Sequence, residues 1–377
     1  MYAPAGAPAA SETMGAMPVD GSTDPDFAPV AEAFGGVLEE HERAGVTGAA
    51  LAVWMDGRWV VDLWGGHADA ARTRRWQSDT LVMPYSVSKP FAAVCALVLA
   101  DRGELDLDRP VSTYWPEMTA DTTVRELLSH QSGHAYLEQS VPTEAFYDWD
   151  LLCRLIAEQQ PQWPPGSGCG ESALLYGHLV GELVRRIDGR SLGTFLTDEV
   201  CRPLELDFHL GLTEPDLHRA ADLTGLDGLP DRIADRSPAM ARALANPPGS
   251  LDASVVNSSA WRRAEIPAVN GHGTARAVAG LFAALGESRL LSPAITADLQ
   301  AVAIRMVDHV LGHETAWGLG VQIEDDGFGM GGTGGSLGWW SDEGRYAIGF
   351  VTGYIADHDR VTRLDNAVRG CLGLPPL

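Results

Sequence analysis

The sequence is short of basic residues and of cysteine, and each shortage excludes a class of function. Lys and Arg number 27 against 51 Asp and Glu, which gives a formal net charge of −24. Such a surface repels phosphate backbones and anionic lipids, so we expect neither nucleic acid nor a membrane as a partner. The cysteines are odd in number and match no metal-ligand spacing, which favours a reduced, cytoplasmic protein without a metal site. They are Cys95, Cys153, Cys169, Cys201 and Cys371.

Long apolar runs are also missing. A transmembrane helix needs roughly 18 or more consecutive apolar residues, and the chain has no such run, so no membrane span is expected. The start of the chain, "MYAPAGAPAASETMGAMPVDGSTDPD", has neither the basic nor the apolar part of a secretory signal. We expect residues 1–25 to form a disordered tail. Hydrophobic residues still make up 45% of the 377 residues, enough for a large globular core.

Hydrophobic periodicity predicts strands near both ends of the chain. Residues 48–66 contain two β-rich runs around Asp56-Gly57, a pair that favours the tight turn of a β-hairpin. A terminal helix is predicted at 359–373. Further strands, forming an antiparallel set, are predicted at 316–325, 328–342 and 345–354.

Between these ends the pattern is helical. An apolar helix is predicted from Lys89 to about Gly103, where glycine favours termination. The last central helix has Thr274 as its predicted N-cap. Further helices are predicted at 123–133, 147–160, 174–189 and 270–287. A sheet assembled from both chain ends, with a helical insertion, follows from this order. The predicted division is an α/β domain from 26–104 and 316–377 and a mainly helical domain from 105–315.

The motif "YSVSKPF" at 85–91 places Ser86 three residues before Lys89. On a helix this spacing puts the lysine amine one turn from the serine hydroxyl. Serine is a poor nucleophile until a base takes its proton, so the pair suits nucleophilic catalysis. The predicted helix begins here, and helix N-termini favour negative charge. The spacing alone fits an ordinary helix start equally well.

Three further segments accompany this motif: "LLSHQSG" at 127–133, "WPPGSGCGESALLYGHLVGE" at 163–182 and "FGMGGTGGSLGWW" at 328–340. In this order and at these distances, the four segments resemble the serine β-lactamase and penicillin-binding-protein superfamily. The closest similarity is to its esterase branch, the class C-like family VIII carboxylesterases, and it covers about residues 28–375.

The resemblance implies a β-lactamase-like α/β fold. In this fold an antiparallel sheet is flanked by helices and joined by an all-helical domain, with the active site between the two domains. Ser86 matches the nucleophile of the family, and Lys89 matches its activating partner.

One departure from the family pattern is at Glu171. The family usually has a tyrosine at this position, which moves protons between the nucleophile, the lysine and the leaving group. A carboxylate near Lys89 would raise the lysine pKa and keep it cationic, which would prevent the amine from taking the proton of Ser86. Alternatively, Glu171 is itself the base, acting directly or through a water, or it moves a proton on a bound small molecule. A solvated glutamate on a loop is the remaining alternative.

A second departure is in the strand beside the implied active site. β-Lactamases commonly have Lys-Thr-Gly there and the esterase branch has His-x-Gly, whereas this chain has Met330-Gly331-Gly332. Methionine carries no charge and donates no strong hydrogen bond. The glycines allow a substrate to approach the strand backbone. The implied oxyanion hole uses the backbone amides of Ser86 and Thr333, which do not depend on side-chain identity.

Other residues are weaker candidates. Those that could line a substrate pocket, although packing explains them as well, are Tyr85, His134, Trp339 and Trp340. Tyr176 is expected to pack within a helix, and His130 is taken as structural. Cys169 lacks an activating pattern. His309 and His313 are four residues apart but lack further metal ligands.

Three functions are compatible with these residues. The favoured one is a serine hydrolase or acyltransferase acting on an ester, thioester or amide of a small molecule through an acyl-Ser86 intermediate, and we expect it to be intracellular and to fit specialised metabolism. In the second, Glu171 is the acid or base of an isomerisation, elimination or cyclisation without a covalent intermediate. The third is a non-catalytic binding protein. No cofactor is expected, and the sequence leaves the substrate, the acyl acceptor and the oligomeric state open.

Overall fold

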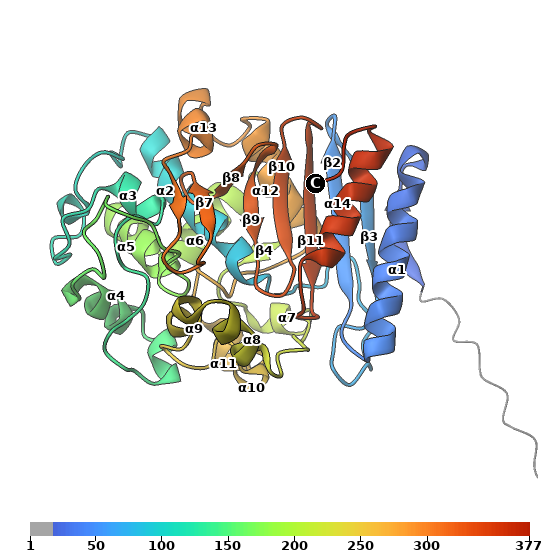
Figure 1. The fold of residues 1–377 in the computed structure, drawn as a ribbon, viewed down its shortest axis with the longest axis horizontal. Helices are drawn as coiled ribbons and strands as arrows, with labels where there is room; N and C mark the ends of the chain where they lie inside the picture. The colour runs from blue at the N-terminus through green and yellow to red at the C-terminus, as the bar shows by residue number, and fades with distance from the viewer. Residues whose placement is uncertain (1–17) are drawn as a thin grey trace, which may run out of the picture.

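The centre of the molecule is an antiparallel sheet of nine strands in the computed structural model, which describes residues 18–377. The strand order is β1-β3-β2-β11-β10-β9-β8-β7-β6, so strands from the two ends of the chain meet where β2 pairs with β11 (Figure 1). A separate pair is formed by β4 and β5. The strands are β1 (Val19–Thr23), β2 (Ala49–Met55), β3 (Arg58–Gly65), β4 (Phe208–His209), β5 (His272–Gly273), β6 (Ile304–Val307), β7 (Glu314–Trp317), β8 (Gln322–Glu324), β9 (Gly327–Gly331), β10 (Leu337–Ser341) and β11 (Tyr346–Thr352).

Helices surround this sheet and form the other half of the molecule. The α-helices are α1 (Ala28–Ala44), α2 (Ser88–Asp101), α3 (Val124–Leu128), α4 (Trp149–Glu158), α5 (Tyr176–Asp188), α6 (Leu192–Leu196), α7 (Glu214–Leu217), α8 (Leu229–Arg236), α9 (Pro238–Leu244), α10 (Ala253–Val256), α11 (Ser259–Arg263), α12 (Ala275–Gly286), α13 (Pro293–Gln300) and α14 (Asp359–Cys371). Short 3-10 turns lie at Pro25–Phe27, Tyr85–Val87, Val111–Thr113 and Thr143–Tyr147, and a π turn lies at Thr197–Cys201.

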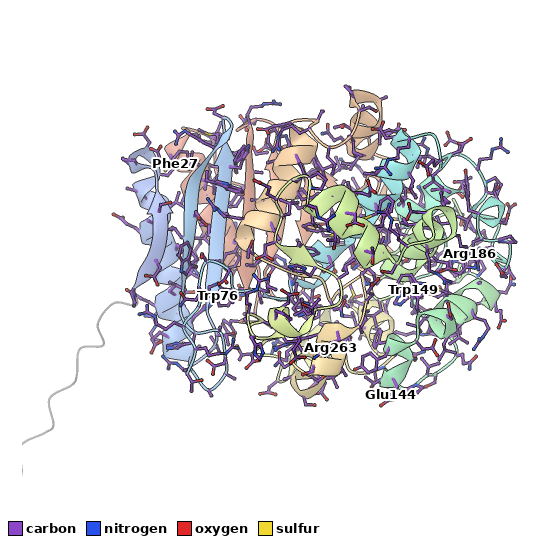
Figure 2. All side chains as sticks on the ribbon, turned by 180° about the vertical axis from the view of Figure 1, so that it is seen from behind. Phe27, Trp76, Glu144, Trp149, Arg186 and Arg263 are labelled. Atoms are coloured by element: carbon purple, nitrogen blue, oxygen red, sulfur yellow. The ribbon has the colours of Figure 1, made fainter. Side chains whose placement is uncertain are left out.

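The two faces of the sheet are covered by different helices. Figure 1 shows α1 and α14 along one face, and Figure 2, seen from behind, shows α12 in orange across the other. The contact between α12 and the sheet is close because Gly349 of β11 has no side chain. A Cβ atom there would overlap the backbone oxygen of Ala275 in α12. Both faces are therefore buried, which explains why every residue of β11 is buried and most are apolar.

The helical half lies at the opposite end of the molecule from α1. Figure 2 shows Trp149 and Arg186 in this half and Phe27 beyond the sheet at the other end. Helix α2 joins the halves, because it packs against α5 and α6 and its N-terminal turn contacts β9. Twelve of the fourteen residues of α2 are buried. The start of α2 is thus held between the sheet and the helices.

Most of the predicted helices and the strand at 345–354 are confirmed, with bounds that differ by a few residues. The predicted strand stretches 316–325 and 328–342 each overlap two strands, β7 with β8 and β9 with β10. The Asp56-Gly57 turn joins β2 and β3, and both residues have positive φ angles, of 50° and 77°. Thr274 caps α12 by accepting a hydrogen bond from the amide of Ala277. The predicted helix at 123–133 is shorter, because His130 has a φ of 60° and the chain turns away after Leu128.

Two predicted boundaries are wrong, the end of the tail at residue 25 and the end of the helical domain at residue 315. Residues 19–23 form β1 rather than part of a disordered tail, because they pair with β3 at the edge of the sheet. Residues 1–17 lie outside the described part of the chain. Strand β6 and helix α12 fall inside the predicted helical domain, yet β6 extends the sheet and α12 covers one of its faces. Within residues 18–377, no helix is long and apolar enough to cross a membrane.

Four buried histidines are expected to make stability depend on pH. Burial lowers the pKa of His41, His130 and His272 to about 3 and that of His178 to about 4, from an ordinary value of 6.5. Between the lowered pKa and 6.5, a histidine takes up a proton only in the unfolded chain. The free energy of unfolding is therefore at its maximum above pH 6.5 and decreases as the pH falls below that value. Each histidine contributes a slope of at most about 1.4 kcal/mol per pH unit.

Urea unfolding between about pH 5 and pH 7.5 measures this slope. His178→Gln should reduce it, because neither ring nitrogen of His178 has a partner among the described residues. The matched substitution at the exposed His313 should leave the slope unchanged. A free energy of unfolding that does not vary with pH in the parent protein would contradict the prediction.

Candidate active site

Ser86 lies in the 3-10 turn that leads directly into α2. Tyr85 before it has a φ of 50°, a conformation that bulky residues seldom adopt and that functional turns often contain. Lys89 is in the first turn of α2, and its Nζ lies 2.8 Å from Ser86 Oγ. The contact expected from the Ser-x-x-Lys spacing is therefore present.

Glu171 completes a triangle with these two side chains. Its Oε1 lies 2.9 Å from Lys89 Nζ and 3.1 Å from Ser86 Oγ. Lys89 is fully buried and Glu171 is 5% exposed, whereas Ser86 is partly exposed. The alternative of a solvated glutamate on a loop is thus wrong. Of the three side chains, the serine is the most open to an incoming molecule.

The contacts of Lys89 determine where the serine proton points. Besides Ser86 and Glu171, its Nζ faces the backbone oxygens of Ala173 at 3.1 Å and Ala268 at 3.3 Å. These are four acceptors for at most three N–H groups, a setting that suits an ammonium. An ammonium donating to Ser86 Oγ leaves the hydroxyl proton free to be donated to Glu171 Oε1. The geometry therefore offers the carboxylate as the proton acceptor.

Burial and charge act in opposite directions on this pair. Burial lowers the pKa of Lys89, and attraction to Glu171 offsets only part of that effect. Glu171 does raise the pKa of Lys89, as predicted, but burial is the larger influence. For Glu171, burial raises the pKa, yet attraction to Lys89 and His130 and hydrogen bonds from Lys89 and Ser86 lower it on balance. The carboxylate is therefore ionised at neutral pH, and we take the resting pair as an ammonium and a carboxylate.

Asp308 fixes the backbone of Glu171 and was missed by the sequence analysis. It is fully buried, and its Oδ1 accepts hydrogen bonds from the amides of Glu171 at 3.2 Å, Val310 at 2.8 Å and Leu311 at 2.8 Å. Its Oδ2 accepts a bond from Trp317 Nε1 at 2.9 Å. No local motif marks this role, since Asp308 lies 137 residues from Glu171.

Removal of this anchor is expected to slow acylation without stopping it. Asp308→Ala frees the Glu171 amide, and the resulting displacement of the carboxylate should lower the acylation rate by about 10- to 100-fold. Asp308→Asn retains an oxygen for the three amides and should lose less. Single-turnover acylation rates of both variants, measured with unfolding curves, test the role. Equal losses in the two variants would show that the hydrogen bond to the amide is not responsible.

The end of β9 approaches the Ser86 turn closely. A Cβ atom on Gly332 would overlap the backbone oxygen of Pro84, so glycine here allows the strand to contact the turn rather than a substrate. The amide of Thr333 donates no hydrogen bond within the described chain and Thr333 is partly exposed, as an oxyanion donor would require. The oxyanion role of Ser86 and Thr333 stays a prediction.

Several residues predicted to bind substrate are elsewhere. Met330 is 1% exposed and belongs to the apolar core beneath β9. A Cβ atom on Gly331 would face His358 Nε2 at 3.1 Å. Trp339 packs with residues of the cluster beneath α1 and α14, on the face of the sheet away from α12, and its Nε1 donates to Asp326 O at 3.3 Å. Strand alternation places Trp340 on the α12 side, where it is buried against Gly286.

Tyr85 and His134 are both buried. Tyr85 belongs to the apolar core, and its hydroxyl donates to Ser250 O at 2.9 Å, so packing accounts for its position and a substrate-binding role for it stays a prediction. His134 is 1% exposed, and its Nδ1 lies 3.2 Å from Ser132 O. A binding role for His134 stays a prediction.

The residues expected to pack do so. The Tyr176 hydroxyl donates to Leu128 O at 2.9 Å, and its ring lies beside that of His130. Burial raises the pKa of Cys169 to about 12, which leaves the thiol protonated and a poor nucleophile. The ring of His309 packs edge-on against Trp163, and the described residues contain no cluster that could hold a metal.

The fold and the triangle of Ser86, Lys89 and Glu171 define a β-lactamase-like protein with an altered proton-handling position. Comparison with known proteins agrees with this class. The β-lactamase family profile matches residues 34–365. The chain therefore belongs to the β-lactamase family.

Individual relatives cover most of the chain. It is 33% identical over 370 residues to the esterase/β-lactamase LipL of Mycobacterium tuberculosis strain ATCC 25618 / H37Rv, with 88% of this chain and 82% of LipL covered. The crystal structure of a family VIII carboxylesterase is 34% identical, with a TM-score of 0.84 over 94% of this chain and all of that one. A penicillin-binding-protein homologue from Caulobacter crescentus is 32% identical, with a TM-score of 0.82 over the same shares. The resemblance to the esterase branch is thus confirmed.

Proposed function

We propose that the protein is a serine hydrolase or acyltransferase acting on an ester, thioester or amide of a small molecule through an acyl-Ser86 intermediate. One observation carries the proposal: the Oγ of a partly exposed serine lies within hydrogen-bond distance of both a buried ammonium and a buried carboxylate. A base beside a serine hydroxyl is the arrangement that makes serine a nucleophile.

Acylation would use the three side chains as a unit. Ser86 Oγ bonds to the carbonyl carbon of the substrate while its proton passes to Glu171 Oε1. Lys89 stabilises the negative charge that develops on Oγ, because its ammonium already donates to that atom. The amides of Ser86 and Thr333 would receive the carbonyl oxygen as it becomes an oxyanion. Cleavage of the bond to the leaving group follows, and the leaving atom takes the proton that Glu171 holds.

Deacylation would reverse these steps with a second molecule. Water, or another acceptor, attacks the acyl carbon and gives its proton to the carboxylate of Glu171. Ser86 Oγ leaves and recovers that proton, so each cycle restores the starting protonation. Hydrolysis and transfer differ only in which acceptor reaches the acyl group. The printed names of the relatives, an esterase/β-lactamase and a family VIII carboxylesterase, support ester substrates for this chain.

The position of the ion pair beside Ser86 favours covalent chemistry over the alternative of a free acid or base. Glu171 Oε1 is directed at Ser86 and Lys89, and Ser86 is the most exposed of the three residues. A small molecule would therefore meet Ser86 first. We further propose that the partner is a small-molecule substrate and that neither nucleic acid nor a membrane is bound, since the chain carries a net charge of −24.

Intact-mass measurement after exposure to a p-nitrophenyl ester or a fluorophosphonate tests this proposal. The expected result is one adduct, mapped by peptide sequencing to Ser86. Protein that turns the ester over but forms its adduct at another residue, or remains unmodified by both reagents at every pH, would overturn the acyl-Ser86 intermediate.

A further inference from the structure

The second oxygen of Glu171 accepts no hydrogen bond from the described residues. Oε1 meets both Ser86 and Lys89, whereas no side-chain or backbone donor within residues 18–377 bonds to Oε2. Oε2 is not one of the fully buried side-chain atoms that lack a hydrogen-bond partner. Because it accepts no hydrogen bond from the described residues, part of its surface must be exposed. Glu171 itself is 95% buried, since 5% of its surface is exposed. An ionised and largely buried carboxylate therefore presents one free oxygen beside the nucleophile.

Neither Lys89 nor His130, the two basic neighbours of Glu171, supplies a donor to this oxygen. The N–H groups of Lys89 are taken up by Ser86, Glu171 Oε1, Ala173 and Ala268. The Nε2 of His130 is itself without a partner, so it makes no hydrogen bond to Glu171. A buried carboxylate oxygen that lacks a donor is costly, and a ligand that supplies one gains a charge-assisted hydrogen bond. The free oxygen thus selects for a donor on the substrate.

Charge around the site points to the kind of donor. Met330, which carries no charge, stands where the family pattern has a lysine or a histidine, and its side chain is buried in the core. The Lys89 ammonium is directed inward at protein acceptors, and the whole chain is strongly acidic. A substrate carboxylate would therefore meet Glu171 without a compensating cation, whereas a substrate ammonium would be attracted to it.

We propose that the substrate carries a protonated amine on the carbon next to the reacting carbonyl, and that this amine donates a hydrogen bond to Glu171 Oε2. The position follows from the geometry: Ser86 Oγ becomes bonded to the carbonyl carbon, and Glu171 Oε1 is 3.1 Å from Oγ. A substituent one bond from the carbonyl carbon is the nearest group that can reach the other oxygen of the same carboxylate. The substrate class is then α-amino esters, thioesters or amides, an inference that rests on the proposed acyl-Ser86 function.

Four methyl esters of matched shape test the inference. Alanine methyl ester (both enantiomers), methyl isobutyrate and monomethyl methylmalonate differ at one position, which holds an ammonium, a methyl group or a carboxylate. We expect kcat/KM at about pH 6.5 to be about 10- to 100-fold higher for one alanine ester than for isobutyrate, and lowest for the methylmalonate. The preference should fall as the pH rises through about 7 to 8, where the amine loses its proton.

Binding without turnover provides a second readout. In Ser86→Ala, alanine amide should bind at least about tenfold more tightly than isobutyramide in calorimetry. Adding Glu171→Gln should remove that difference, whereas adding Glu182→Gln, at a buried glutamate paired with Arg185 and Arg186 in α5, should not. If the parent enzyme acylates at Ser86 with isobutyrate and alanine esters equally well, the amine inference is overturned and the proposed function stands. If no ester or fluorophosphonate modifies Ser86, the proposed function fails, and the inference fails with it.

Discussion

Replacing Ser86 by alanine is expected to abolish the covalent adduct and to lower ester turnover by about a thousandfold or more. The reason is that Lys89 and Glu171 converge on Ser86 Oγ, and both remain buried when that atom is removed. Intact mass after treatment with a fluorophosphonate and with a p-nitrophenyl ester, across about pH 6 to 9, gives the result directly.

The matched control is Ser88→Ala. Ser88 lies two residues further along the chain, is fully buried, and accepts a hydrogen bond from the Gly271 amide at 3.0 Å. We expect this variant to lose some stability and to keep the adduct at Ser86. Turnover that survives in Ser86→Ala at the parent rate would direct attention to the non-covalent chemistry of Glu171.

Replacing Glu171 by glutamine is expected to slow acylation of Ser86 by about 10²- to 10⁴-fold, the range of a lost general base. The pH dependence supplies a sharper readout. In the parent protein the pKa of Glu171 is lowered, so the carboxylate is ionised above its ordinary value of 4.5 and activity should fall only below that pH. Activity should also fall at alkaline pH, because Lys89 loses its ammonium proton. The pKa of Lys89 is lowered, so this alkaline limb of the pH–activity profile lies below the ordinary value of 10.5. Glutamine does not titrate, so Glu171→Gln should lack the acid limb.

The same variant distinguishes two possible bases. Glutamine removes the negative charge beside Lys89, which favours the neutral lysine amine because an unpaired buried charge is costly. If the lysine amine were the base, the substitution would free it, and acylation would be retained or faster. Glu182→Gln is the control for loss of a buried, ion-paired glutamate outside the site, and should leave both limbs in place.

The local parts of the site could be predicted from the sequence, and the long-range parts could not. Ser86 and Lys89 are one helical turn apart, so their contact follows from spacing. The position of Glu171 followed from a departure in a family motif, but its burial depends on contacts with residues 85 positions away. Asp308 carries no motif, because its role is to accept hydrogen bonds from amides that the fold brings to it.

The expectation that Trp339 lines the substrate pocket failed for a different reason. Trp339 and Trp340 are adjacent, so strand alternation sends them to opposite faces, and the sequence alone does not say which residue faces which layer. The pairing of Trp340 with Phe328 and of Gly338 with Met330 settles the faces. Glycine at Gly338 leaves room for Phe282 of α12, which fixes that side as the buried interface.

The connection between β6 and β7 offers a route for protein engineering. The loop begins at the buried Asp308, whose amide donates to His313 O at 2.9 Å, while the side of the loop formed by Gly312 and His313 is exposed. Libraries that vary the exposed loop residues would shift the position of Asp308 and, through its hydrogen bond, that of the Glu171 amide. They would change no side chain that contacts the substrate. Substitutions on the surface of this short loop are therefore expected to change the catalytic rate. Grafted loops that retain the aspartate are the natural starting point for such changes.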